Sequence, residues 1–212
     1  MKVSVTITMS KYDRIETIKK LNETNADYLH LDVMDGKFVS KILYPIEEVK
    51  EFIFYNKKPI DIHLMVEDVK KVIDEFSTIN PEIITFHYEA VDNVLEVINY
   101  IKSYNIKAGL CIKPSTKVEE IIKFLPYLDQ VLVMTVEPGL GGQSFIPEMI
   151  IKTTHLKHLR EKHNYNYLIA VDGGINEETK NYVSDADVLS SGSFVCMSDD
   201  FQKQIDKLKT QK

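Results

Sequence analysis

The sequence predicts an α/β fold of the (β/α)8, or TIM barrel, class. Eight short runs rich in apolar and β-branched residues alternate with longer amphipathic runs, which is typical of βαβ units around a parallel sheet. Polar residues interrupt the apolar runs mainly at their C-terminal ends, where barrel enzymes carry their active sites. A count of eight favours a closed barrel. An open doubly wound sheet remains the alternative, because weak strands are easily miscounted.

The expected elements are spaced along the whole chain. The strands comprise residues 2–8, 27–33, 59–65, 82–87, 106–112, 130–135, 167–172 and 187–191. Helical patterns lie between them, at residues 11–24, 46–56, 67–79, 91–104, 116–125, 146–163, 176–184 and 199–210. No linker is long enough to separate domains, so we expect residues 1–212 to form a single barrel domain.

The composition limits the classes of protein to consider. The net charge is −6 and no cluster of lysine or arginine occurs, which argues against a nucleic-acid partner. No apolar run reaches the length of a membrane span, and the N-terminal pattern breaks too early for a secretory signal. Cys111 and Cys196 provide neither a disulfide framework nor a metal-binding spacing. We therefore expect a soluble cytoplasmic protein with no membrane partner.

The second expected strand carries a titratable pair on one face. In the stretch YLHLDVMDG, His30 and Asp32 lie two residues apart, so their side chains point to the same side of an otherwise apolar strand. An unpaired buried carboxylate is costly, so some partner must satisfy it. His63 near the end of the third strand and Asp172 at the end of the seventh should meet this pair at one mouth of the barrel.

Two imidazoles and two carboxylates can share a divalent cation. A single core histidine is more often simply hydrogen-bonded, but four such groups on three strands favour a metal site. His87 alone does not meet this criterion and fits either a hydrogen-bonded core residue or a supporting group. Asp61 lies deeper than His63 and is placed to orient a ligand.

Three methionines lie near the ends of the second, third and sixth expected strands: Met34, Met65 and Met134. Methionine commonly fills irregular gaps in a core. Because these three flank the polar cluster, an apolar lid over a charged intermediate is an equally supported role.

Glycine-rich stretches follow the last three strands. They are EPGLGGQ at 137–143, DGGIN at 172–176 and SSGSF at 190–194. Each alone is weak, but together they form a concave set of main-chain N–H donors, and the loops after strands 7 and 8 are a recurrent phosphate site in barrels. A small phosphorylated ligand is therefore expected, with its reactive end over the metal.

Asp32 and Asp172 are expected on opposite sides of the mouth. One carboxylate could remove a proton beside a carbonyl while the other returns one from the opposite face, with a metal holding the enediolate oxygens. Such a transfer inverts a stereocentre, which indicates epimerisation of a keto-sugar phosphate.

The chain closely resembles the ribulose-phosphate 3-epimerase family. The resemblance rests on LHLDVMDG, DIHLMV, ITFHYEA, VMTVEPGLGGQSFIPEM, VDGG and SGS, which occur in the family's order over nearly the whole chain. It implies a barrel of the ribulose-phosphate binding type, a metal-dependent enzyme of the pentose phosphate pathway that interconverts D-ribulose 5-phosphate and D-xylulose 5-phosphate. The metal would be one divalent zinc, manganese or iron ion, and a homo-oligomer is also expected.

The resemblance also assigns roles to residues. Four positions match the family's metal ligands, namely His30, Asp32, His63 and Asp172, and the two aspartates also match its acid/base pair. Substrate contacts are expected from Thr6, His63, Met34, Met65, Met134, Gly139, Leu140, Gly141, Gly142, Gly173, Gly174, Gly192 and Ser193.

Some stretches depart from the family's pattern and leave alternatives open. Residues 37–41 (KFVSK) differ in a loop expected over the substrate, so a sister epimerase acting on a hexulose 6-phosphate such as D-allulose 6-phosphate remains the first alternative. A sugar-phosphate-binding barrel without catalysis is less favoured, because both aspartates are present. A decarboxylase or aldolase would need a catalytic lysine facing the mouth. The second and third expected strands place none there, although Lys113 follows the fifth.

Overall fold

A computed structural model describes residues 1–210 of the chain. Its strands are β1 (Lys2–Thr6), β2 (Tyr28–Asp35), β3 (Ile42–Leu43), β4 (Ile60–Met65), β5 (Ile83–His87), β6 (Lys107–Ile112), β7 (Gln130–Met134), β8 (Leu168–Asp172) and β9 (Val188–Ser191). The α-helices are α1 (Arg14–Asn22), α2 (Ile46–Ile53), α3 (Val69–Ser77), α4 (Val94–Ser103), α5 (Ile150–His163), α6 (Ser193–Cys196) and α7 (Phe201–Lys209). Five 3₁₀ segments complete this part of the chain: η1 (Tyr88–Ala90), η2 (Val118–Glu120), η3 (Ile122–Tyr127), η4 (Pro147–Met149) and η5 (Thr179–Val183).

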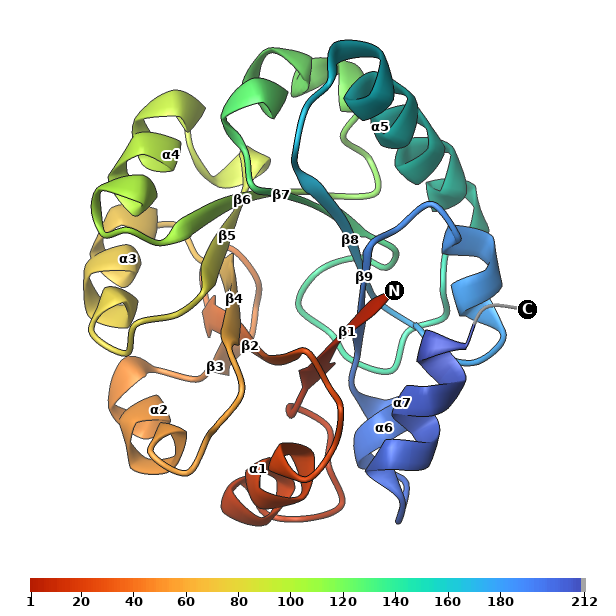
Figure 1. Ribbon diagram of the computed structural model, residues 1–212. Helices are drawn as coiled ribbons and strands as arrows, with labels where there is room; N and C mark the ends of the chain where they lie inside the picture. The colour runs from red at the N-terminus through yellow and green to blue at the C-terminus, as the bar shows by residue number, and fades with distance from the viewer. Residues whose placement is uncertain (211–212) are drawn as a thin grey trace.

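Eight parallel strands close into the predicted barrel. The sheet runs in the order β1, β9, β8, β7, β6, β5, β4, β2, and β1 also pairs with β2, which closes the ring. Viewed along its axis, the ring of strands lies inside a ring of helices (Figure 1). The (β/α)8 prediction is therefore confirmed, and the open sheet is excluded.

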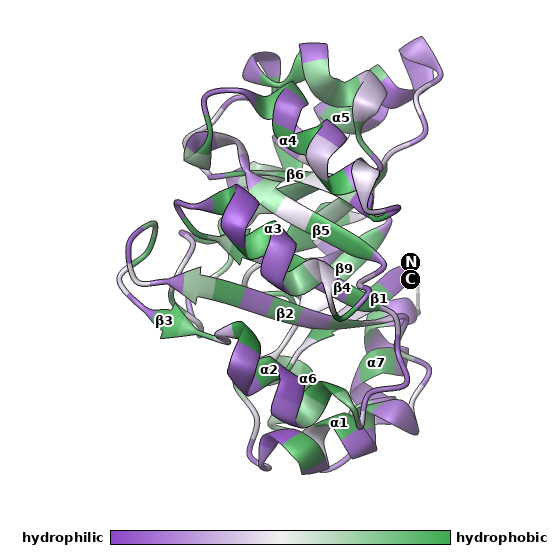
Figure 2. Cartoon of the chain, turned by 90° about the vertical axis from the view of Figure 1, so that its left-hand side faces the viewer, coloured by the Kyte–Doolittle hydropathy of each residue, from purple (hydrophilic) through white to green (hydrophobic). Residues whose placement is uncertain are grey.

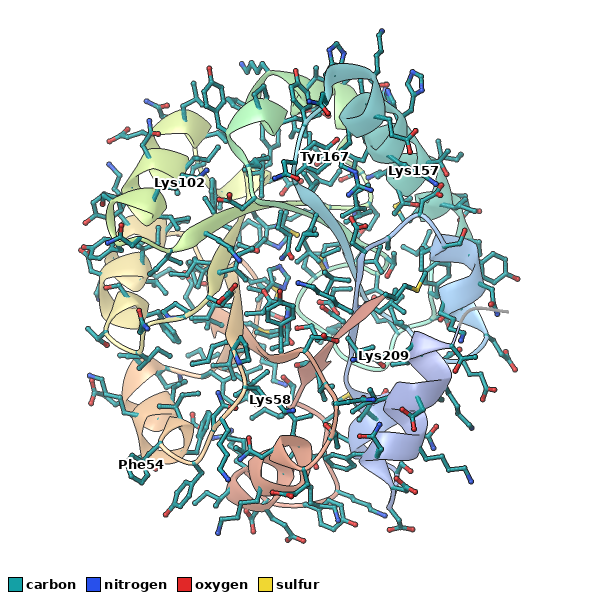
Figure 3. All side chains as sticks on the ribbon, in the orientation of Figure 1. Phe54, Lys58, Lys102, Lys157, Tyr167 and Lys209 are labelled. Atoms are coloured by element: carbon teal, nitrogen blue, oxygen red, sulfur yellow. The ribbon has the colours of Figure 1, made fainter. Side chains whose placement is uncertain are left out.

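The strands form because both of their faces are covered. All six residues of β4 and all five of β5 are buried, as expected for parallel strands between a packed interior and an outer layer of helices. Side chains fill the middle of the ring, so the interior is a core rather than a pore (Figure 3). By contrast, Phe54 after α2 points away from the barrel and is 88% exposed.

The two ends of the barrel differ in what they carry. In the side view, β2 runs toward the end where the β3 hairpin lies, and the N-terminus lies at the opposite end (Figure 2). The last turn of α7 is tied to that opposite end, because Lys209 Nζ lies 2.8 Å from a carboxylate oxygen of Asp27, just before β2. The C-terminal ends of the strands are thus free to form a mouth.

The predicted helices occur at the expected positions, but two of them are 3₁₀ segments rather than α-helices. Residues 116–125 form η2 and the start of η3, because Pro126 cannot donate a hydrogen bond inside a regular helix. Within 176–184 the chain forms only η5, where the Asn176 side chain accepts from two main-chain N–H groups. The short strand β3, antiparallel to the end of β2, and the single-turn helix α6 were not predicted.

No helix within residues 1–210 is both long enough and apolar enough to cross a bilayer.

Candidate active site and metal centre

The register of neighbouring strands brings the predicted polar residues together. β2 pairs with β4 so that His30 lies beside Asp61 and Asp32 beside His63. On the other side of the barrel, Asp172 ends β8, three strand pairings away from β2 through β1 and β9. Because all these strands are parallel, the residues lie at the same end of the barrel.

His30, Asp32, His63 and Asp172 form one cluster. One ligand atom from each lies within 4.8 Å of all the others. His63 Nδ1 is 3.1 Å from Asp32 Oδ1 and 3.7 Å from Asp172 Oδ2, while His30 Nε2 is 3.3 Å from Asp32 Oδ1. The two imidazoles are fully buried and the two carboxylates are nearly so. The structure thus brings the four predicted ligands together.

The donor set fits a divalent cation. The other nitrogen of His30, Nδ1, lies 2.8 Å from Asp61 Oδ2, and the same oxygen accepts a hydrogen bond from Ser4. His30 Nε2 is buried and has no hydrogen-bond partner although it faces the carboxylates. A buried nitrogen of this kind, held in place through its second nitrogen, is the usual arrangement of a metal-binding histidine.

The electrostatics of the cluster favour a positive charge. Burial alone raises the pKa of a carboxyl group, but the adjacent imidazoles of His30 and His63 outweigh it and lower the pKa of Asp32. Burial and the negative charge of Asp32 raise the pKa of Asp172 to about 6. Burial lowers the pKa of His30, but Asp61 and Asp32 outweigh it, so its pKa lies well above the ordinary value. The position suits a cation, whether a proton or a metal ion.

A third histidine, His87 at the C-terminal end of β5, extends the cluster toward the loops after β5 and β6. His87 Nε2 is 2.9 Å from His63 Nε2, and His87 Nδ1 is 3.1 Å from Glu89 Oε2. Burial is the largest effect on His87 and lowers its pKa to about 4, so this imidazole is neutral near pH 7. Cys111 is also buried beside His63 and His87.

A large cavity opens above the cluster. Its volume is about 1320 Å³, and Asp32 and Asp172 line it together with Thr6, which donates a 2.8 Å hydrogen bond to Asp32 Oδ2. All predicted substrate residues except His63 line it: Thr6, Met34, Met65, Met134, Gly139, Leu140, Gly141, Gly142, Gly173, Gly174, Gly192 and Ser193. His63 lies buried and is not among the lining residues, so its expected contact with substrate stays a prediction.

Two of the glycines have a clear conformational reason. Gly173 and Gly174 have φ angles of +118° and +65°, which residues with a Cβ rarely adopt. A Cβ at Gly174 would lie 2.8 Å from the main-chain nitrogen of Phe145. The loops after β7 and β8 therefore pack main chain against main chain where Gly174 meets Phe145, and both residues line the cavity.

Sequence reasoning missed several residues of the site. Ser190 Oγ is buried without a hydrogen-bond partner, and Ser190 lines the cavity next to Asp172 in the β8–β9 register. Its signal was a polar residue in an expected strand, DVLSS. Lys41 is the only lysine or arginine among the described residues lining the cavity. Glu89 had no signal in the sequence, because its role depends on its neighbour His87.

Comparison with solved structures supports the fold. The KGPDC of Streptococcus mutans has a TM-score of 0.69 at 12% identity, covering 98% of this chain and 95% of that one. The 3-hexulose-6-phosphate synthase of Salmonella typhimurium has a TM-score of 0.68 at 17% identity, covering 98% and 96%. At such identities the similarity concerns the barrel alone.

Comparison with sequences is more specific. The profile of the ribulose-phosphate 3 epimerase family matches residues 2–196. The chain is 38% identical to the ribulose-phosphate 3-epimerase of Methanocaldococcus jannaschii, over 99% of this chain and 90% of that protein. It is 37% identical to the ribulose-phosphate 3-epimerase of Bacillus subtilis, over 92% and 91%. The chain is therefore an epimerase that belongs to the ribulose-phosphate 3-epimerase family.

Proposed function

We propose that this epimerase inverts C3 of a keto-sugar phosphate and interconverts D-ribulose 5-phosphate and D-xylulose 5-phosphate. The observation that carries the proposal is the pair of carboxylates, Asp32 and Asp172, which face one cavity from strands three pairings apart. Inversion requires a proton to leave one face of the carbon and another to arrive on the opposite face. Two carboxylates on opposite sides of a bound sugar meet that requirement.

Each carboxylate acts on one face of the substrate. In one direction, a carboxylate takes the C3 proton, and the electrons of the C–H bond form an enediolate with the adjacent carbonyl. The other carboxyl group then gives its proton to C3 from the opposite face, and in the reverse direction the roles exchange. Thr6 supports this work because its hydroxyl donates to Asp32 and fixes the orientation of that carboxylate.

His30, Asp32, His63 and Asp172 would hold one divalent ion, for which zinc, manganese and iron suit the mixed nitrogen and oxygen donors. When bound, the ion would stabilise the negative charge that develops on the enediolate oxygens. Met34, Met65 and Met134 line the same cavity with little exposure and would exclude water from the reacting carbon.

The phosphate group would lie at the glycine-rich loops. The loops after β7, β8 and β9 all line the cavity, and their main-chain N–H groups would serve as donors to the phosphate. Because Lys41 is the only basic side chain among the described lining residues, main-chain donors must provide most of the attraction for the anion. A non-phosphorylated pentulose should therefore be a poor substrate.

We propose a cytoplasmic location, which the substrate class and the two thiols support. Cys111 and Cys196 are buried and unpaired, which suits the reducing cytoplasm where sugar phosphates are metabolised. A homo-oligomer and a single domain remain predictions, to be measured by light scattering and by the cooperativity of unfolding.

A coupled assay with D-ribulose 5-phosphate, D-allulose 6-phosphate and unphosphorylated ribulose tests the proposal. The pentulose phosphate should have the highest kcat/KM, and a strong chelator should abolish turnover until zinc, manganese or iron is restored. Preference for the hexulose phosphate would assign the sister activity instead. Equal activity on ribulose and its phosphate would contradict the phosphate site.

A further inference from the structure

A chain of hydrogen bonds leads from the candidate metal centre to the turn after β5. It runs from His63 through His87 to Glu89, with distances of 2.9 Å between the two Nε2 atoms and 3.1 Å from His87 Nδ1 to Glu89 Oε2. The side chains of His63 and His87 have no exposed surface. Water therefore cannot replace either imidazole, and the protons must be arranged within the chain itself.

Glu89 determines the direction of this chain. Its Oε1 accepts from the main-chain N–H of Lys113 at 2.9 Å and from the hydroxyl of Thr116, so the carboxylate acts as an acceptor. Its Oε2 must then accept the Nδ1 proton of His87. A neutral His87 with its proton on Nδ1 has a lone pair on Nε2, and that lone pair requires a proton on Nε2 of His63.

The consequence reaches the metal centre. A neutral His63 with its proton on Nε2 has its lone pair on Nδ1, the atom that faces Asp32 Oδ1 at 3.1 Å and Asp172 Oδ2 at 3.7 Å. A lone pair pointing at two carboxylates is repulsive unless a cation lies between them. The same arrangement occurs on the other side, where Asp61 holds Nδ1 of His30 and leaves Nε2 toward the carboxylates.

We propose that His87 and Glu89 are positioning residues that fix His63 in the Nε2–H tautomer and so present Nδ1 as a metal ligand. This inference rests on the proposed metal site. Carboxylate or imidazole groups behind a ligating histidine commonly change metal affinity by about 10–100-fold. The Phe38 ring packs against His87, with the two ring centroids 4.7 Å apart, and Lys113 Nζ lies 4.1 Å from the centroid of the Phe38 ring.

A different reading makes His63, His87 and Cys111 a second metal site, since their ligand atoms lie within 4.8 Å of one another. The 2.9 Å separation of the two Nε2 atoms argues against it. That distance is typical of a hydrogen bond, in which one nitrogen carries a proton and cannot bind metal. The positioning role predicts one metal ion per chain, whereas a second metal site predicts two.

The test compares zinc affinity and His63 tautomer between wild type and four variants. His87→Phe removes the acceptor, His87→Gln restores an acceptor oxygen, and Glu89→Ala removes the group that orients His87. His158→Phe, on the exposed surface of α5, is the matched control. Zinc affinity is measured by competition with a chromogenic chelator, and tautomers by two-bond ¹H–¹⁵N correlation of labelled histidines, with His63 assigned from the spectrum of His63→Ala.

Wild-type protein should bind one zinc ion with His63 in the Nε2–H form. His87→Phe should bind zinc about 10–100-fold more weakly, Glu89→Ala should also bind more weakly, and His87→Gln should stay within a few-fold of wild type. Excess metal should restore the kcat of His87→Phe with KM unchanged, which a general loss of structure would not allow. If His87→Phe does not fold, the zinc affinities of Glu89→Ala and His87→Gln test the inference: the first should be weaker than that of wild type, and the second should be close to it.

Unchanged zinc affinity and tautomer in both His87→Phe and Glu89→Ala would overturn the inference while leaving the proposed function intact. Two ions per wild-type chain, with one lost in His87→Phe, would replace it by the second-site reading. A wild-type chain that binds no ion would instead refute the metal site of the proposed function, and with it this inference.

Discussion

Asp32 and Asp172 are the two residues on which the proposed inversion depends, and their surroundings differ. Asp32 accepts a hydrogen bond from Thr6 and lies beside two imidazoles, whereas Asp172 has the negative charge of Asp32 as a close neighbour. Both side chains are largely withdrawn from water. Two carboxylates in such different surroundings are suited to different steps of one reaction.

Replacing either carboxylate should stop epimerisation while preserving the fold. In Asp32→Asn and in Asp172→Asn, kcat should fall by about two orders of magnitude or more, because a positioned acid or base is lost. Each variant should still exchange the C3 hydrogen of one epimer with deuterated solvent, as measured by NMR. Asp206→Asn, at an exposed position of α7, is the control. Near wild-type turnover in either variant with metal bound would exclude the two-carboxylate mechanism.

The hydroxyl of Thr6 should matter for a separate reason. Thr6→Val removes the 2.8 Å hydrogen bond to Asp32, and hydrogen bonds to charged groups contribute about 1.5–3 kcal/mol, so kcat/KM should fall by about 10–100-fold. Thr6→Ser keeps the hydroxyl and should stay within a few-fold of wild type. A Thr6→Ser variant as impaired as Thr6→Val would indicate that the methyl group, which packs toward Gly192, is what matters.

Among the site residues, those at strand ends could be predicted from the sequence. Those whose role depends on a contact between neighbouring strands could not. His30, Asp32, His63 and Asp172 could be predicted because a polar residue in a buried parallel strand stands out against its neighbours. Glu89 follows a strand and looks like an ordinary surface residue. Its partnership with His87 and with the Lys113 N–H is visible only once the β5–β6 register is known.

At the scale of elements, Glu89 joins two segments at the mouth of the barrel. Burial alone raises the pKa of a carboxyl group, but hydrogen bonds from His87, Thr116 and the N–H of Lys113 outweigh it and lower the pKa of Glu89 to about 2. The 3₁₀ turn after β5 is thereby fastened to the loop after β6. The strength of this connection should depend on pH.

A carboxyl group with a lowered pKa in the folded state stabilises the fold above its unfolded pKa of about 4.3, and this contribution is lost as pH falls toward 2. Between pH 5.5 and pH 3, wild type should therefore lose about 1.5–2 kcal/mol more unfolding free energy than Glu89→Gln, which does not titrate. Urea unfolding at a series of pH values measures this difference. Parallel pH dependences of the two proteins would show that Glu89 is not stabilised as an ion.

Helices and strands could be predicted where the repeating pattern of apolar residues extends over many residues, and could not where the element is only a few residues long. The strands and most long helices have clear alternation or amphipathic spacing. The two-residue β3 is too short to show alternation, and it forms because residues 42–43 can pair with the end of β2. The 116–125 region has helical spacing, but Pro126 favours short 3₁₀ turns there.

At the scale of the whole molecule, ligands from β2, β4 and β8 connect distant parts of the ring. An ion bound to them would hold together strands that are far apart in sequence, and it would bind the folded chain only. At 100 times its dissociation constant, such an ion would add about 2.7 kcal/mol to stability.

Metal should therefore raise the thermal midpoint of the barrel. For a chain of this size, Tm should increase by about 5–10 °C in wild type on adding zinc or manganese to the chelated protein. The His30→Ala/His63→Ala double variant should show no such increase and should contain no bound metal by elemental analysis. An equal increase in both proteins would place the binding site elsewhere.

The positions of Met1 and of the last turn of α7 have a practical consequence. Met1 and the last turn of α7, which Lys209 holds beside Asp27, lie at the end of the barrel opposite the mouth. A carrier bead, a fluorescent protein or a second enzyme joined at either end would sit behind the barrel and leave the path of the sugar open. The chain should therefore keep its turnover when immobilised by either end, and it could be coupled in series with another enzyme without redesigning its loops.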